Sequence, residues 1–346
     1  MNSLSRFNSF IAFRPILQSY SSSFFRGASE HLKKSIYLSI NDLAFKKLFC
    51  SSSTPKDALK AFKAPDTVDF NVNGACNLNC TWCWGPDHKA KEELTNEQWK
   101  EIALKLKSLG TKKITFTGGE TLMKSGLEEI LKYVHDDLAI RTTLSTNGIL
   151  LRRRAKEVLP YVDDIGLPLD GHSREINNIM RVGTPKHFDR VLEAIKTVQD
   201  VFPNIDVTVR TVCSAKNADS VPLIGQTMIK SGIDPEKLRW KIYQVAPIGV
   251  RKEAVLNGDW LISYERFQEI MEKVRDMNKM FPNISTLPIG NHVGRYFHIY
   301  PDGKSHVFMT GKDGFPASFP TGNIGKNFDS VMNNLDLLDL TNNKIR

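Results

Sequence analysis

Three cysteines stand close together in the stretch Cys76-Asn77-Leu78-Asn79-Cys80-Thr81-Trp82-Cys83, with the spacing C-x3-C-x2-C. Three thiols on one short segment can reach a single metal centre, and soft thiolates select zinc or iron–sulfur clusters over hard cations. Structural zinc normally takes four protein ligands, but the other two cysteines, Cys50 and Cys213, stand alone. The spacing therefore favours a cubane cluster with one iron open to another molecule. A degenerate zinc knuckle that borrows Cys50 or Cys213 is the alternative.

This cysteine pattern resembles the signature of the radical S-adenosylmethionine (radical SAM) superfamily. The resemblance implies an enzyme with a [4Fe–4S] cluster on Cys76, Cys80 and Cys83, whose fourth iron is chelated by the amino and carboxylate groups of S-adenosylmethionine. It also implies reductive cleavage of that cofactor to a 5′-deoxyadenosyl radical, which abstracts hydrogen from a substrate. An electron donor such as ferredoxin or flavodoxin is the expected partner. A non-catalytic metal-binding scaffold protein that retains the fold is the alternative of another class.

The composition bounds the remaining possibilities. At 346 residues the chain can hold one large domain or two ordinary ones. Few cysteines, clustered at ligand spacing, argue against a secreted disulfide scaffold. No apolar run approaches the roughly 18 residues needed to span a bilayer. Residues 1–64 carry ten Lys/Arg and three Asp/Glu, so seven of the nine net positive charges lie there. The nearly neutral body does not look like a domain that binds long nucleic acid.

The first 64 residues form a basic, serine-rich extension. Residues 1–29 contain arginines and many serines but no acid, which is typical of a mitochondrial transit peptide. Residues 30–50 could form an amphipathic helix that lies on a membrane surface. A disordered extension of a cytoplasmic protein is the remaining interpretation. The ordered body is expected to begin near Pro65.

From Thr67 onward, strand and helix patterns alternate. Six such repeats predict a parallel sheet with right-handed crossovers, and they resemble the radical SAM partial (β/α)6 barrel, a TIM-like α/β fold that would occupy residues 65–282. A flat doubly wound sheet is the alternative. The predicted strands are Thr67–Asn73, Lys113–Thr117, Ile140–Ser145, Asp164–Leu169, Asp206–Cys213 and Leu238–Gln244, and the predicted helices are Thr95–Leu109, Leu127–Val134, Leu150–Leu159, Phe188–Val201, Val221–Lys230 and Tyr264–Met280.

Residues 283–346 follow a different pattern and are assigned to a C-terminal extension. Tyr296–Tyr300 and Ser305–Phe308 flank an Asp-Gly turn, which predicts a β-hairpin. Gly311–Asn323 is rich in glycine and proline and is expected to be a loop, and Phe328–Leu340 is expected to be a helix. No cysteine follows Cys213, so the auxiliary cluster of peptide-modifying family members is not expected.

Candidate cofactor residues follow the predicted strands, whose carboxyl ends meet at one face of such a barrel. Gly118-Gly119-Glu120 follows the second strand, where the family places the methionine amino group of the cofactor. The resemblance assigns Ser145 and Asn147 of Ser145-Thr146-Asn147-Gly148 to the ribose or carboxylate, and Arg181 to the carboxylate. It places the aromatic Trp82 near the adenine. An ordinary strand-to-helix turn is the alternative interpretation of Ser145-Thr146-Asn147-Gly148. A surface arginine is the alternative interpretation of Arg181.

Candidate substrate residues lie further along the chain. Alternation puts Arg239 and Lys241 on one face of the sixth strand, where paired cations suit a phosphate. This strand resembles that of the viperin-like nucleotide dehydratases, and the resemblance adds Arg210 and either Tyr296 or Tyr300. It implies a nucleoside triphosphate as the best candidate substrate. A sugar, nucleoside or peptide is the alternative substrate. The alternative interpretation of Arg239 and Lys241 is that they lie on an outward strand face and form ion pairs.

Overall fold

A ten-stranded sheet organises the part of the chain that the structure, a computed structural model, describes: residues 65–85, 92–289, 297–310, 316–336, 338–339 and 344–345. These residues all fall within one compact unit, Phe62–Arg346. The predicted targeting segments in residues 1–50, together with Cys50 and Tyr296, lie outside the described residues. None of the helices in these ranges is both long enough and apolar enough to cross a bilayer.

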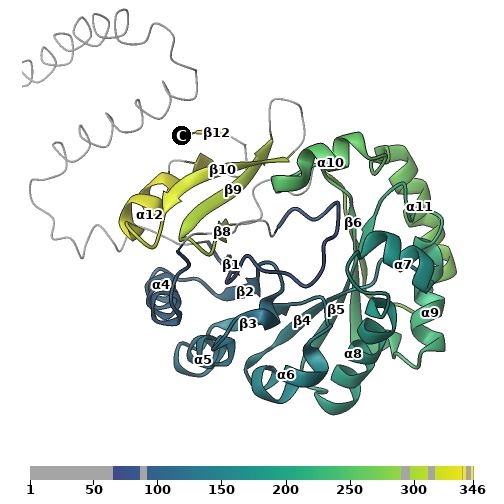
Figure 1. Cartoon of the computed structure of the whole chain (residues 1–346), viewed down its shortest axis with the longest axis horizontal. Coiled ribbons are helices and arrows are strands. Elements are labelled where there is room, and N and C mark those ends of the chain that lie inside the picture. Colours follow the sequence, from purple (N-terminus) through teal and green to yellow (C-terminus); the bar gives the residue numbers. More distant parts are fainter. Residues whose placement is uncertain are drawn as a thin grey trace, which may run out of the picture. The chain divides into compact units, whose positions relative to one another are not determined.

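Eight parallel strands form most of the sheet (Figure 1). Strands β1 to β6 lie in chain order, β7 (Ile284–Leu287) pairs with β6, and β8 (Phe297–Ile299) pairs with β1 on the other side. The predicted partial barrel is confirmed, and β7 and β8, which lie in the predicted C-terminal extension, add a strand to each side of it. The six remaining parallel strands are β1 (Thr67–Asn71), β2 (Lys113–Thr117), β3 (Arg141–Ser145), β4 (Asp164–Pro168), β5 (Asp206–Cys213) and β6 (Leu238–Gln244).

Helices cover the outer side of this sheet (Figure 1). The first is fixed by the predicted capping box, in which Thr95 and Gln98 exchange hydrogen bonds with each other's backbone N–H. The helices are α4 (Asn96–Ser108), α5 (Leu127–Lys132), α6 (Leu151–Val158), α7 (Arg174–Met180), α8 (His187–Val201), α9 (Ile224–Lys230), α10 (Lys252–Asn257), α11 (Tyr264–Met277) and α12 (Phe328–Asp336).

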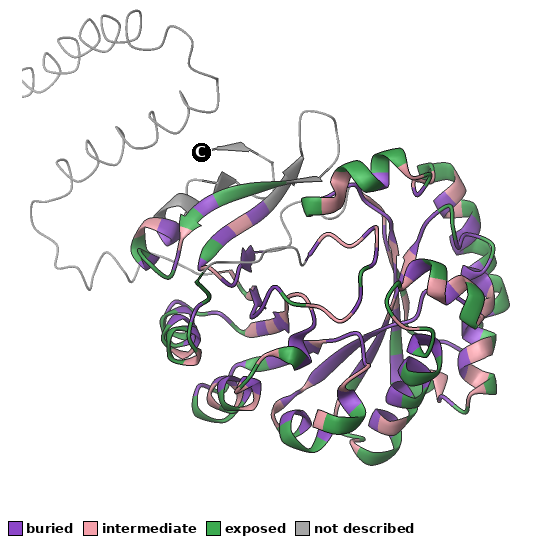
Figure 2. Cartoon of the chain, viewed as in Figure 1, coloured by how far each residue is buried: buried purple, intermediate pink, exposed green. Residues whose placement is uncertain are grey.

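The two faces of the sheet differ in polarity. Residues such as Phe70 and Trp240 are fully buried against the helices, as the purple segments of Figure 2 indicate. The alternate positions on the inner face carry polar side chains, among them Asp69, Lys113 and Lys241. Small parallel barrels normally fill their interior with branched apolar residues. A polar interior is therefore the first sign that this barrel holds a ligand rather than a packed core.

The C-terminal hairpin is confirmed. Strand β9 (Lys304–Thr310) runs antiparallel to β8, and Gly303 takes the turn with φ +77°. The loop expected over Gly311–Asn323 is wrong from Pro316 onward, because β10 (Pro316–Asn323) pairs antiparallel with β9. Its prolines are tolerated because β10 is the edge strand of the sheet. Two short strands, β11 (Leu338–Asp339) and β12 (Lys344–Ile345), pair after α12.

Candidate functional site

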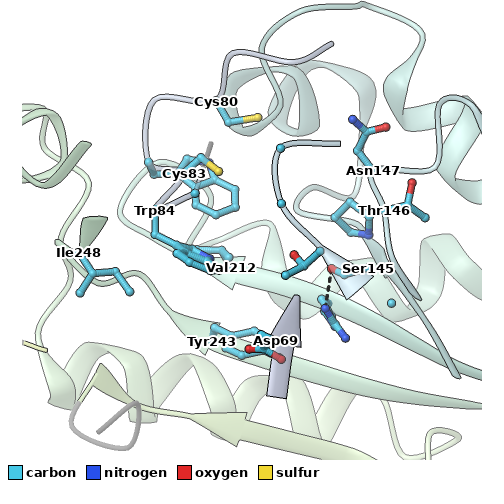
Figure 3. Close-up of a pocket in the computed structure, with 18 of the residues that line it drawn as sticks. Asp69, Cys80, Cys83, Trp84, Ser145, Thr146, Asn147, Val212, Tyr243 and Ile248 are labelled. Carbon is cyan, nitrogen blue, oxygen red and sulfur yellow. Dashed lines mark hydrogen bonds between the residues drawn. The ribbon is translucent and has the colours of Figure 1, made fainter. Parts of the chain in front are cut away.

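A cavity of about 350 Å³ lies inside the barrel, between the strands and the cysteine loop, residues 74–85 (Figure 3). Cys80 and Cys83 lie at one end of it, and Asp69 and Tyr243 lie at the other, with Ser145 along the side. The predicted metal ligands and most of the predicted cofactor and substrate residues therefore line a single cavity.

The three cysteines have the donor chemistry of an iron–sulfur cluster. Cys80 is buried, and Cys76 and Cys83 are partly buried. Among the described residues, no group of three His, Cys, Asp or Glu side chains is placed to hold a single metal ion. Burial raises the pKa of the Cys76 thiol to about 11, so its thiolate forms readily only when a metal binds it. Cys213 belongs to the main hydrophobic core and not to the loop, which removes it from the zinc alternative.

The glycines of the Gly118-Gly119-Glu120 motif allow the turn after β2 to lie directly against the cysteine loop. The Gly119 N–H donates to the Asn73 carbonyl at 2.9 Å, and the Glu120 N–H donates to the Ala75 carbonyl at 2.7 Å. A Cβ on Gly119 would lie 2.0 Å from the Ala75 oxygen, so only glycine fits there. The backbone of Gly118 and Gly119 lines the cavity, where its carbonyls can accept from a ligand ammonium.

The Glu120 side chain binds the turn that follows β3. Its carboxylate turns away from the cavity, is 1% exposed, and accepts hydrogen bonds from the Thr146 hydroxyl at 2.5 Å, the Asn147 N–H at 2.7 Å and the Leu122 N–H at 3.0 Å. Burial raises its pKa, against the effect of these donors. The carboxylate thus fixes the turn after β3, and among the residues of this motif Gly118 and Gly119 line the cavity.

The turn after β3 contacts the cysteine loop through Asn147. Its side-chain N–H donates to Asn77 Oδ1 at 2.6 Å. Ser145 lines the cavity, and its hydroxyl accepts a hydrogen bond from Arg210 at 2.8 Å. The structure thus brings both predicted residues of this turn to the cavity, together with Thr146.

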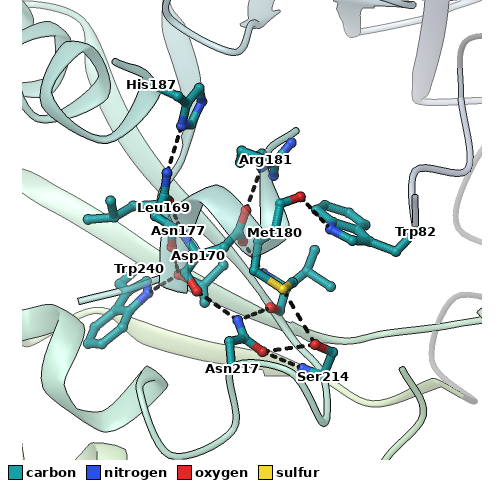
Figure 4. Close-up of polar contacts among 12 residues, drawn as sticks. Trp82, Leu169, Asp170, Asn177, Met180, Arg181, His187, Ser214, Asn217 and Trp240 are labelled. Atoms are coloured by element: carbon teal, nitrogen blue, oxygen red, sulfur yellow. Dashed lines mark hydrogen bonds and ion pairs between the residues drawn. The ribbon is translucent and has the colours of Figure 1, made fainter. Parts of the chain in front are cut away.

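Arg181, which directly follows α7, contacts Trp82 of the cysteine loop (Figure 4). Its Nε pairs with the fully buried Asp170 at 2.5 Å, and its guanidinium lies 4.6 Å from the ring centre of Trp82. Burial lowers the pKa of Arg181, but the negative charges of Asp170 and the nearby cysteines raise it by more. The pKa of Arg181 is therefore above its usual value. The Trp82 indole N–H donates to the Met180 carbonyl at 2.9 Å. Arg181 and Trp82 both line the cavity, and the Arg181 η nitrogens make no hydrogen bond within the described chain.

Three cations line the inner wall of the barrel: Lys113 on β2, Arg210 on β5 and Lys241 on β6. Arg210 and Lys241 are direct register partners. Gly166 on β4 leaves room for the Arg210 guanidinium, because a Cβ there would lie 2.4 Å from it. Burial lowers the pKa of Lys113. Lys113 was not predicted, although its alternation with apolar Ile114 and Phe116 gives the same signal as that of Lys241.

Arg239 does not join this group of cavity-lining cations. It lies near the amino end of β6, where its guanidinium contacts Asp164 at 2.6 Å and Asp206 at 3.5 Å. It shares a strand face with Lys241, but it lies two residues further from the carboxyl end of the strand. The paired aspartates hold it outside the cavity lining.

On the β8 side of the cavity, the residue that lines the wall is His298 and not Tyr300. His298 lines the cavity, and its Nδ1 lies 3.4 Å from Asp69 Oδ2. Its ring lies 4.8 Å from that of Trp84. Tyr300 is buried behind it, outside the main cavity lining, and burial raises its pKa to about 12. Tyr300 is therefore not among the residues that line the main cavity.

Comparisons with known proteins agree with this geometry. Residues 70–217 match the radical SAM superfamily. The chain is 29% identical over 281 residues to the Fe-coproporphyrin III synthase of Methanosarcina barkeri, covering 74% of this chain and 67% of that protein. It is 26% identical over 220 residues to an S-adenosylmethionine-dependent nucleotide dehydratase of Flammeovirga pacifica, covering 60% and 71%. It spans only 40% of the sporulation killing factor maturation protein SkfB of Bacillus subtilis, at 27% identity over 49% of this chain.

Solved structures share the fold. Streptococcus suis SuiB bound to S-adenosylmethionine superposes with a TM-score of 0.58 at 17% identity, covering 83% of this chain and 71% of that one. The protein anSMEcpe with bound AdoMet and a Cp18Cys peptide gives 0.58 at 17% identity, covering 81% and 82%. The solved structures show that the fold is shared, and the family match shows that residues 70–217, which carry the three cysteines, form a domain of the radical SAM superfamily, an enzyme family built on a [4Fe–4S] cluster and S-adenosylmethionine.

Proposed function

We propose that this radical SAM enzyme acts on a small anionic substrate, with a nucleotide as the best candidate. The observation that carries the proposal is that Lys113, Arg210 and Lys241 line the same cavity as the three cysteines. When bound, the cluster and S-adenosylmethionine supply a 5′-deoxyadenosyl radical that takes a hydrogen atom from the substrate. The protein binds and orients both molecules and excludes water.

The charge of the wall supports an anion. Arg210 and Lys241 are neighbours on adjacent strands, and like charges directly opposite each other destabilise a sheet. Among the described lining residues Asp69 is the one acidic side chain, and it lies beside His298. A phosphate or carboxylate between the cations would offset their repulsion and accept their hydrogen bonds.

The Asp69–His298 pair gives the cavity a second polar wall. Burial lowers the pKa of His298, although Asp69 opposes this, so the imidazole is neutral near pH 7 and can donate or accept a hydrogen bond. A substrate with an acidic end and a hydrogen-bonding sugar or base would therefore find a partner on each wall. This pattern suits a nucleotide.

Relatives named for nucleotide chemistry support the same choice. They include the nucleotide dehydratase of Flammeovirga pacifica and the GTP 3′,8-cyclase of Clostridium perfringens, which is 26% identical over 244 residues. A porphyrin carboxylate is the second candidate, because other relatives are named as Fe-coproporphyrin III synthase and AdoMet-dependent heme synthase. We also propose a ferredoxin or flavodoxin as the electron donor.

The experiment is anaerobic turnover of the reconstituted full-length chain with S-adenosylmethionine and dithionite. The four common nucleoside triphosphates, iron coproporphyrin III and a mixed peptide pool are compared, and 5′-deoxyadenosine is measured by mass spectrometry. We expect one triphosphate to raise 5′-deoxyadenosine well above the substrate-free rate, and Lys241→Met to abolish that rise. Cys83→Ala is the control that abolishes all cleavage.

A rise with the porphyrin or the peptides alone would overturn the nucleotide proposal. A rise with the porphyrin that Lys241→Met also abolishes would retain the anionic wall and change the substrate. A rise with the peptides that ignores Lys241→Met would reject the anionic substrate altogether.

A further inference from the structure

The segment that follows β6 lies directly against the cysteine loop. Gly249 begins the single 3₁₀ turn Gly249–Arg251 with φ +72°, and a Cβ there would lie 2.0 Å from the carbonyl oxygen of Trp84. Both the backbone angle and the close approach exclude other residues at this position. Glycine therefore allows the turn to touch the loop one residue after the third cysteine.

Two residues further on, Arg251 reaches the middle of the loop. One of its η nitrogens donates to the Cys80 carbonyl, and the other donates to Asn79 Oδ1 at 2.7 Å. The Cys83 N–H also donates to the Cys80 carbonyl, at 3.2 Å. The backbone between the second and third cysteines is thus held from two sides, and its shape depends on a residue about 170 positions away in the chain.

The same segment supplies the apolar packing of the loop. Leu78, Cys80 and Trp82 belong to a small cluster that is separate from the main core, and Val255 and Trp260 are among its other members. The main core therefore does not fix the cysteine loop. The loop depends for its position on the turns after β2 and β3, on Arg181, and on the residues that follow β6.

Arg251 also places a positive charge beside the cysteine loop. Its guanidinium contacts the Cys80 carbonyl and Asn79 Oδ1, so the charge lies beside the segment that holds the second and third cysteines. A positive charge in a partly buried setting favours the more negative, reduced form of a nearby redox group. Groups that hydrogen-bond around metal ligands commonly affect both metal affinity and potential.

We infer that Arg251 is a positioning residue of the iron–sulfur site: it fixes the backbone of the cysteine loop and raises the reduction potential of the cluster. Gly249 makes this contact possible. The inference rests on the superfamily of the chain and not on the proposed substrate, so its test uses no substrate.

The test compares full-length variants reconstituted anaerobically with iron and sulfide. Arg251→Gln removes the charge and changes the donors, and Arg251→Lys keeps the charge but cannot reach both acceptors with the same geometry. Asn79→Ala removes one acceptor from an exposed position. Arg174→Gln is the matched control, because Arg174 also donates two hydrogen bonds, both to the exposed Asp189. Three quantities are measured: iron and sulfide per chain, the rate of iron loss to a chelator, and the midpoint potential.

We expect Arg251→Gln to lose iron about 10–100-fold faster than the wild type and to have a more negative midpoint potential. Arg251→Lys should lose iron faster but keep the potential close to that of the wild type. Asn79→Ala should lose iron faster by a smaller factor. Arg174→Gln should match the wild type in all three quantities.

Arg251→Gln with the iron-loss rate and the potential of Arg174→Gln would overturn the inference. The melting of the cluster-free form shows whether Arg251→Gln folds. If it does not, the rates of iron loss of Arg251→Lys and Asn79→Ala decide whether the inference holds. Wild-type rates of iron loss in both would reject the role of Arg251. Faster loss in either one, with unchanged melting of the cluster-free protein, would support it.

Discussion

At the scale of single residues, surroundings separate side chains that the sequence pattern treats alike. Arg210 and Arg239 both point to the inner side of adjacent strands. Arg210 lines the cavity and donates to the Ser145 hydroxyl, whereas Arg239 is paired with Asp164 and Asp206. A cation already matched by two carboxylates has little affinity left for a ligand, so the two arginines should respond differently to the same substitution.

We expect Arg210→Gln to lower substrate-dependent formation of 5′-deoxyadenosine about 10–100-fold at low substrate, because a hydrogen bond to a charged group contributes roughly 1.5–3 kcal/mol. Arg239→Gln should leave that rate within about two-fold and lower the stability instead, because Asp164 then loses its charged partner. Initial rates and urea unfolding measure the two effects. Equal losses of rate in both variants would contradict this assignment.

The buried His187 provides a pH-dependent test of the packing behind Arg181. Burial, and then the charge of Arg181, lower its pKa to about 3, and its Nδ1 lies 2.9 Å from Asn177 Nδ2. The unfolded chain therefore takes up this proton near pH 6.5 and the folded protein only near pH 3. The contribution to stability is complete above pH 6.5 and is lost as the pH falls toward 3, by about 2 kcal/mol at pH 5.

His187→Gln should remove this dependence while keeping an acceptor for Asn177. The fall in the free energy of unfolding between pH 7 and pH 5 should be about 2 kcal/mol smaller in the variant than in the wild type. Urea unfolding at the two pH values gives the comparison. The same fall in both proteins would show that His187 is charged in the folded state or is not buried as described.

At the scale of elements, the loops at the carboxyl ends of the strands hold one another in place. The turn after β2 contacts the entry of the cysteine loop, the turn after β3 contacts Asn77, and the turn after β6 contacts Trp84. Two of these contacts require glycine because backbone meets backbone. The site therefore depends on a few positions where any side chain would separate the loops.

Two glycines with similar backbone angles test this. Gly249 has φ +72° and meets the Trp84 backbone, whereas Gly232 has φ +75° and nothing closer than 3.7 Å. Gly232→Ala should cost about 1–2 kcal/mol from the backbone angle alone and leave iron retention unchanged. Gly249→Ala should add a displacement of the turn from the cysteine loop, measured as faster iron loss to a chelator. Equal iron retention in the two variants would show that the contact with Trp84 is unimportant.

At the scale of the whole molecule, the described residues of the cavity come from the part of the chain after Pro65. They lie between Thr67 and His298. Removal of residues 1–64 should therefore leave the iron content and the basal cleavage of S-adenosylmethionine within about two-fold of those of the full chain, since none of the described lining residues is lost. Iron analysis and 5′-deoxyadenosine measurement check this. A truncated chain that cannot hold a cluster would show that the extension supports the fold.

Residues 1–29, which carry arginines and no acid, are proposed to act as a mitochondrial address within the basic extension. A fusion of residues 1–64 to a fluorescent protein should be directed to mitochondria, because the composition of residues 1–29 is typical of import signals. The matched control replaces Arg6, Arg14 and Arg26 by glutamine and should be diffuse. Accumulation of the unmodified fusion on other membranes would instead favour the amphipathic stretch at residues 30–50.

The sequence by itself predicted the three candidate cluster ligands and determined most of the barrel. Strands β2, β5 and β6 begin and end where alternation predicts, because each has apolar residues at every second position and a polar inner face. The spacing of Cys76, Cys80 and Cys83 is local, so it could be read without the fold. The short helices α7 and α10 and strand β7 were missed, because each has too few residues to show a period.

Only the tertiary structure decided which polar residues meet. The direction of Glu120, the pairing of Arg239 with two aspartates, and the contact of Arg251 with Cys80 all join residues from separate parts of the chain. Alternation gives the face of a strand but not the depth within the barrel, so it could not separate Lys241 from Arg239 or His298 from Tyr300. Depth depends on the register of eight parallel strands and on the loops above them, and these are fixed by packing across the whole sheet.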